Sequence, residues 1–200
     1  MIATPPDYSW LADDAGDGSY DFTYVRGLTP EQLVTRLGGR PDTFTPGGRH
    51  GPAWRTPPAS GMTIGVTAVG DWAFVLGDGS FGITEEIVMP LSAGTRLVSQ
   101  FLLGVKGIDY FYWIEDGEIR FYFIAQEGYP DEVPEELVKT MNEIDSLYRP
   151  FAYPCEGPSF LLSERLTGIT LTEQLVMEST YLWGVVPEPQ SRDIPDPWRG

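Results

Sequence analysis

The sequence predicts an α+β fold: a single domain in which helices pack against an antiparallel sheet of about five or six strands. Hairpin patterns fill the earlier part of the chain and helical patterns gather towards its end, an order typical of this class. Residues 94–126 are predicted to form two or three adjacent strands, and they contain the strongest hairpin signal, where Asp116-Gly117 separates two apolar runs. We expect this hairpin to organise the core.

Apolar side chains occupy both faces of the expected hairpin. Alternation along a strand places residues two apart on the same face. The first strand would carry Tyr110, Tyr112 and Ile114 on one face and Phe111 and Trp113 on the other, and the second would carry Phe121 and Phe123 opposite Tyr122 and Ile124. Because both faces are apolar, we expect a central hairpin that is covered on both sides.

The other elements follow from the same kinds of signal. Further strands are expected at residues 21–25, 62–69 and 72–76, and helices at residues 29–37, 83–92, 134–148, 157–166 and 171–180. The first helix has the clearest start, since Thr29 is followed by Pro30 and, three residues on, by Gln32, as in a capping box.

Two segments fall outside these elements. Residues 40–61 are rich in Pro and Gly, show no periodicity and are expected to form a long loop, of the kind that is mobile or functional. Residues 181–186 are apolar and should dock on the core. We therefore expect residues 1–186 to form one α+β domain and residues 187–200 to form a Pro-rich C-terminal tail.

The charge is the most unusual property of the chain. Asp and Glu number 29 and Lys and Arg 13, which gives a net charge of −16, and the basic residues are scattered singly. This pattern disfavours binding to nucleic acids and to anionic membranes, because both rely on clustered basic residues. An acidic protein can instead attract a basic protein, although such a charge also simply keeps a protein soluble.

The cysteine count and the hydropathy pattern indicate a cytoplasmic protein. Cys155 is the single cysteine, so no internal disulfide can form, which fits a reducing compartment. No apolar run is long enough to cross a membrane, and the first residues lack the basic and apolar regions of a signal peptide.

Several segments of the chain together resemble a family of uncharacterised actinobacterial proteins that carry a domain of unknown function. They are the segments FTYVRGLTPEQLVTRLGG (22–39), GDW (70–72), SAGTRLV (92–98), YWIEDGEIRF (112–121), the helix that follows Pro130, and LTGITLT (166–172). The resemblance covers roughly residues 7–187. It implies a single-domain, intracellular bacterial protein, and it implies no activity.

The motifs that suggest catalysis or a cofactor are incomplete. Residues 77–82 (GDGSFG) match G-x-G-x-x-G, but Asp78 would place a negative charge in a phosphate loop, and no acidic residue lies near position 100, so we expect a plain turn. Residues 13–18 lack the ligand spacing of a calcium loop. His50 and Cys155 do not complete a nucleophilic or zinc site. We expect no cofactor and no metal.

The sequence therefore favours a non-catalytic, acidic interaction protein, for example an immunity-type or regulatory partner of a basic protein. The predicted binding residues lie in one acidic segment: Glu127, Tyr129, Asp131, Glu132, Glu135 and Glu136. The alternative for this segment is that its carboxylates only complement the start of the following helix. A different function is a small-ligand or hydrolytic pocket under the 40–61 loop, formed by His50, Arg49, Trp54 and nearby carboxylates.

Overall fold

The computed structural model describes residues 8, 10, 11, 20–51, 58–77, 80–103, 108–124, 127–147 and 158–189. The described residues form eight strands: β1 (Tyr20–Arg26), β2 (Thr45–Gly47), β3 (Met62–Val69), β4 (Trp72–Gly77), β5 (Arg96–Leu103), β6 (Ile108–Glu115), β7 (Glu118–Ile124) and β8 (Tyr181–Val186). The helices are α2 (Pro30–Arg36), α3 (Glu85–Leu91), α4 (Glu135–Leu147), α5 (Pro158–Thr167) and α6 (Glu173–Glu178), with 3-10 turns η1 (Pro41–Thr43) and η3 (Phe81–Ile83).

The eight strands form one open antiparallel sheet in the order β2-β8-β3-β4-β1-β5-β6-β7. The α+β class is confirmed, whereas the expected five or six strands are too few. The two strands that the sequence did not predict are β2, which lies inside the expected 40–61 loop, and β8, which was expected only as an apolar segment. Both depend on pairing between distant residues: β8 pairs with β2 on one side and β3 on the other.

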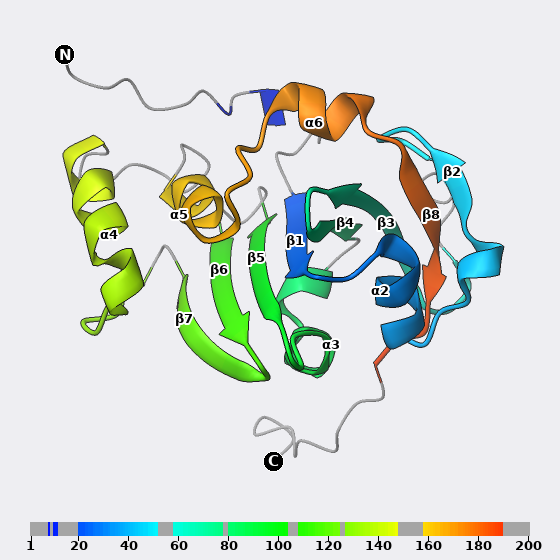
Figure 1. Ribbon diagram of the computed structural model, residues 1–200, viewed down its shortest axis with the longest axis horizontal. Helices are drawn as coiled ribbons and strands as arrows, with labels where there is room; N and C mark the ends of the chain where they lie inside the picture. Colours follow the sequence, from blue (N-terminus) through cyan, green and yellow to red (C-terminus); the bar gives the residue numbers. More distant parts are fainter. Residues whose placement is uncertain are drawn as a thin grey trace.

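Helices cover both faces of the sheet (Figure 1). On one face, side chains from α4, α5 and α6 pack with the aromatic residues of the strands, such as Tyr24, Phe74 and Trp113. On the other face, α2 and α3 pack with smaller side chains such as Val25, Val75 and Leu97. The result is a three-layer arrangement with a core on each side of the sheet.

The predicted turn of the β6–β7 hairpin is confirmed. Asp116 and Gly117 have φ values of 49° and 77°, as a tight two-residue hairpin turn requires. The predicted faces are also confirmed, since Phe111 and Trp113 belong to one core and Tyr112 and Ile114 to the other. The expectation of a central hairpin is wrong, however. β7 is an edge strand, and the inner position belongs to β1, which pairs with both β4 and β5.

Local signals in the sequence fix the starts of two helices. The Thr29 hydroxyl accepts a hydrogen bond from the Gln32 N–H at 3.2 Å, and the Gln32 side chain accepts one from the Thr29 N–H at 2.9 Å. This reciprocal pair is the predicted capping box. Thr172 caps α6 in a similar way, through the Leu175 N–H at 3.1 Å. In both cases the helix begins where a side chain satisfies a free backbone donor.

Candidate functional site

The acidic segment, residues 127–136, connects the edge strand β7 to helix α4. It begins directly after β7, where the Glu127 N–H donates to the Ile124 carbonyl at 2.8 Å and Gly128 forms an isolated bridge with Ile124. It ends in the first turn of α4, where the Leu137 N–H donates to the Pro134 carbonyl at 2.8 Å. The segment is therefore held at both ends by backbone hydrogen bonds.

Two side chains attach the middle of the segment to the aromatic core. The Tyr129 ring meets the ring of Phe123 edge to face, with centroids 4.9 Å apart, while 40% of Tyr129 remains exposed. Val133 packs, half-buried, against the same core. Together with Pro130 and Pro134, these contacts restrict the backbone before any partner arrives, and a pre-ordered segment loses less entropy on binding.

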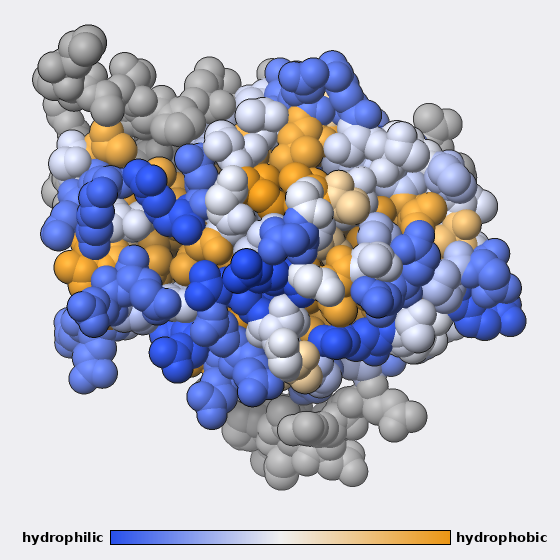
Figure 2. Space-filling model, in the orientation of Figure 1, coloured by the Kyte–Doolittle hydropathy of each residue, from blue (hydrophilic) through white to orange (hydrophobic). Residues whose placement is uncertain are grey.

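The carboxylates of the segment point to solvent. Glu127, Asp131, Glu132, Glu135 and Glu136 are all exposed. Among the described residues, only Glu136 forms an ion pair, with one Oε1–Nη2 distance of 3.9 Å to Arg96. Figure 2 shows hydrophilic surface at the lower left, where this segment lies, next to apolar surface. The other four carboxylates form no ion pair within the described part of the chain, so this short segment carries uncompensated negative charge.

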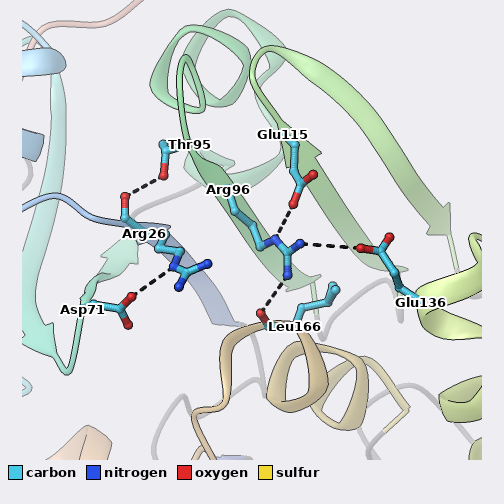
Figure 3. Close-up of polar contacts among 7 residues, drawn as sticks. All are labelled: Arg26, Asp71, Thr95, Arg96, Glu115, Glu136 and Leu166. Atoms are coloured by element: carbon cyan, nitrogen blue, oxygen red, sulfur yellow. Dashed lines mark hydrogen bonds and ion pairs between the residues drawn. The ribbon is translucent and has the colours of Figure 1, made fainter.

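Arg96 links the acidic segment, through Glu136, to the sheet (Figure 3). Its Nε donates to Glu115 and its Nη1 donates to the Leu166 carbonyl at 3.3 Å. Its guanidinium also lies over the Trp113 ring, 5.1 Å from the centroid. These contacts tie the sheet to the start of α4 and the end of α5, so we assign Arg96 a structural role.

A second ion pair in Figure 3 links the end of β1 to the turn between β3 and β4. Arg26 Nε donates to Asp71 Oδ2 at 3.0 Å, and the Thr95 hydroxyl donates to the Arg26 carbonyl at 2.6 Å. The Asp116 carboxylate accepts from the Gly94 N–H at 2.8 Å on the same side. Several of the segments that carry the family resemblance therefore meet at one end of the sheet, and their polar residues bind one another.

The residues of the predicted alternative pocket are described only in part. Arg49 is buried at 8% exposure, whereas His50 is exposed, and Trp54 lies outside the described residues. A shallow groove of about 580 Å³ does lie at the two ends of the 40–61 segment. Its described lining contains Arg40 and Glu188 together with glycine backbone, but neither Arg49 nor His50.

The GDGSFG segment does not offer its last backbone N–H to a phosphate. That donor is used in a contact within the protein. The Gly82 N–H donates to the Asp21 carboxylate of β1 at 2.8 Å. A Cβ at this position would lie 2.1 Å from the Ser99 hydroxyl oxygen, so glycine is required for close packing. Residues 78 and 79, the acidic 13–18 segment and Cys155 lie outside the described residues.

Two findings bear on metals and membranes. Within the described ranges, no group of three or more His, Cys, Asp or Glu side chains is placed to hold a metal ion. No helix in those ranges has the length and apolar character needed to span a bilayer.

Sequence reasoning missed a buried acid and an exposed aromatic. Asp109 is fully buried on β6, and burial raises its pKa well above the ordinary aspartate value. Tyr122 on β7 is 48% exposed although it was expected under a covering layer. Alternation alone finds the face on which each residue lies, but it does not show how far the covering helices extend.

Comparison with known proteins gives a family and no activity. A family model described as "Family of unknown function (DUF6461)" matches residues 1–191, so the chain belongs to this family. No curated protein and no solved structure matches the chain.

Proposed function

We propose that this member of DUF6461 is a non-catalytic protein that binds a basic partner protein through the acidic segment, residues 127–136, as an immunity-type or regulatory partner would. The observation that carries the proposal is the set of four exposed carboxylates of Glu127, Asp131, Glu132 and Glu135, which form no ion pair within the described part of the chain, on a segment whose backbone is held by hydrogen bonds. The net charge of −16 supports the same choice of partner, because it would attract a basic protein over long range.

Tyr129 supports a binding role in addition to charge. Tyrosine is enriched among interface anchors because it offers a rigid, amphipathic surface. Here the ring packs edge to face with Phe123 while 40% of the residue remains exposed. Carboxylates that only complemented the α4 terminus would need no exposed aromatic beside them.

The proposal is tested by capture from a lysate of the source cell with three baits. The first is the wild type, and the second carries Asp131→Lys, Glu132→Lys and Glu135→Lys. The third is a matched control with Glu31→Lys, Asp42→Lys and Glu173→Lys, which changes the net charge equally at exposed positions on other elements.

We expect a basic protein to be captured by the wild type and the control and lost with the segment variant, since local charge decides the contact. All three baits should unfold at similar temperatures, because the changed side chains are exposed. Equal capture by all three baits at low salt would overturn the proposal and leave the carboxylates as a helix start.

A further inference from the structure

The two edges of the sheet differ in how well they are protected. Edge strand β2 spans only Thr45–Gly47 and contains Pro46, and short, proline-containing edges resist pairing with another chain. Edge strand β7 is 7 residues long and contains no proline. Of the described strands, none pairs with its outer side; the isolated bridge to Gly128 occupies only its last residue, Ile124.

An irregularity in β7 places three of its apolar residues together on the face opposite Phe121 and Phe123. Trp113 pairs with Phe121 and Ile114 pairs with Ile119, which leaves Arg120 as an extra residue in a bulge. Residues directly opposite each other in an antiparallel pair share a face. Ile119, Tyr122 and Ile124, here called the β7 strip, are therefore on the face of their partners Ile114, Tyr112 and Tyr110.

The covering layer ends before it reaches this strip. Helix α3 lies over the neighbouring part of the same face, where Ile87, Val88 and Leu91 are buried. Beyond it, 37% of Ile119 and 48% of Tyr122 are exposed. The Tyr122 ring stacks on Tyr112 at a centroid distance of 5.7 Å, so its position is fixed while its outer face is open.

Three exposed carboxylates lie near the strip or at the ends of its strand. Glu85 of α3 is exposed and close enough to raise the pKa of Tyr112, after the larger effect of burial. Glu118 and Glu127, both exposed, stand at the two ends of β7. Arg120 at the bulge is the opposing charge on this strand. The surroundings therefore favour a basic occupant that also presents an apolar or cation–π contact to Tyr122.

We propose that the outer edge of β7 receives an extended basic segment of the partner protein as an additional strand. The main chain of that segment would pair with β7, and its alternate side chains would lie on the β7 strip, with arginine or lysine over Tyr122. This inference rests on the proposed function, since it assumes that the partner is basic. A second copy of this chain is a poor occupant because each copy carries a net charge of −16 and would bring its own Glu118 to the edge.

Two synthetic peptides of equal charge test the proposal on the intact protein. One alternates arginine and valine and can form a strand; the other alternates arginine and proline, so every second residue lacks an N–H and has its φ fixed at about −65°, which disfavours a paired strand. Affinities are measured at low salt, and amide chemical shifts of ¹⁵N-labelled protein locate the bound peptide. The variants are Tyr122→Ala and Tyr122→Phe, with Val185→Ala as the control for loss of an exposed apolar side chain elsewhere.

We expect the arginine–valine peptide to bind about tenfold more tightly than the arginine–proline peptide, with the largest shifts over residues 118–124. Tyr122→Ala should weaken its binding about fivefold, whereas Tyr122→Phe, which keeps the ring, and Val185→Ala should leave it nearly unchanged.

Three outcomes would overturn the proposal. Equal binding of both peptides with shifts confined to residues 127–136 would reject strand addition while leaving the proposed function in place. Dimerisation of the free protein, with concentration-dependent shifts over residues 118–124, would assign the edge to a second copy. Failure of both peptides to bind the wild type would count against the proposed function as well.

Discussion

At the scale of single residues, side chains of similar chemistry have different roles according to whether they are buried or exposed. Asp109 and Asp131 are both aspartates, yet the first is fully buried on β6 and the second is exposed in the acidic segment. The same contrast holds for Trp113, at 0% exposure, and Tyr122, at 48%, on neighbouring strands. Such differences decide which side chains stabilise the fold and which can meet a partner.

Asp109 should make the stability depend on pH in a direction opposite to that of a paired surface carboxylate. Burial raises its pKa in the folded protein, so the folded state holds the proton more tightly than the unfolded state. Its contribution to stability is therefore fully present below the unfolded aspartate pKa of about 3.9 and is lost as the pH rises towards the higher folded value.

Asp109→Asn removes this titration. The free energy of unfolding of the variant, relative to wild type, should increase from pH 4 upward in denaturant titrations at a series of pH values. Asp42→Asn, at an exposed position, is the matched control for replacing an aspartate outside the core. If the free energy of unfolding of Asp109→Asn differs from that of wild type by the same amount at every pH, Asp109 does not have a raised pKa in the folded protein.

At the scale of elements, the hairpin β6–β7 contributes large buried aromatic side chains to the core. Trp113 lies wholly inside the aromatic core, with Arg96 over its ring. Its indole N–H has no hydrogen-bond partner in the described part of the chain, so its contribution comes from packing. Trp113→Ala should lower the free energy of unfolding by about 3–5 kcal/mol.

Denaturant unfolding of two further variants separates packing from other effects. Trp113→Phe keeps most of the buried ring and should be clearly less destabilising than Trp113→Ala. Tyr122→Ala, on the exposed side of the same hairpin, should also have a much smaller effect. A loss for Trp113→Ala no larger than that for Tyr122→Ala would show that the hairpin does not organise the core.

Elements with local signals could be predicted, and elements without them could not. The Asp116-Gly117 turn and the Thr29 capping box are decided by residues close in sequence, and both are confirmed. β2 has only three residues, one of them a proline, and it exists because β8 offers a partner. The edge position of β7 also depends on the strand order of the whole sheet, which alternation does not encode.

At the scale of the whole molecule, charge and topology act together in the account of function. The sequence identified the acidic segment from its composition alone, and the fold places that segment next to the unprotected edge strand β7. The exposed strip on that strand could not be predicted, because it requires both the bulge at Arg120 and the limited reach of α3. Under the proposed function, both surfaces would contact the same basic partner.

The most direct test of the central claim is the association rate of the captured partner, measured by stopped-flow fluorescence at increasing salt. The variant with Asp131→Lys, Glu132→Lys and Glu135→Lys should associate about tenfold more slowly than wild type at low salt, and the two rates should converge as salt screens the charges. The control with Glu31→Lys, Asp42→Lys and Glu173→Lys should stay close to wild type. Equal rates for wild type and the segment variant at low salt, or a difference that salt leaves unchanged, would contradict electrostatic recognition by residues 127–136.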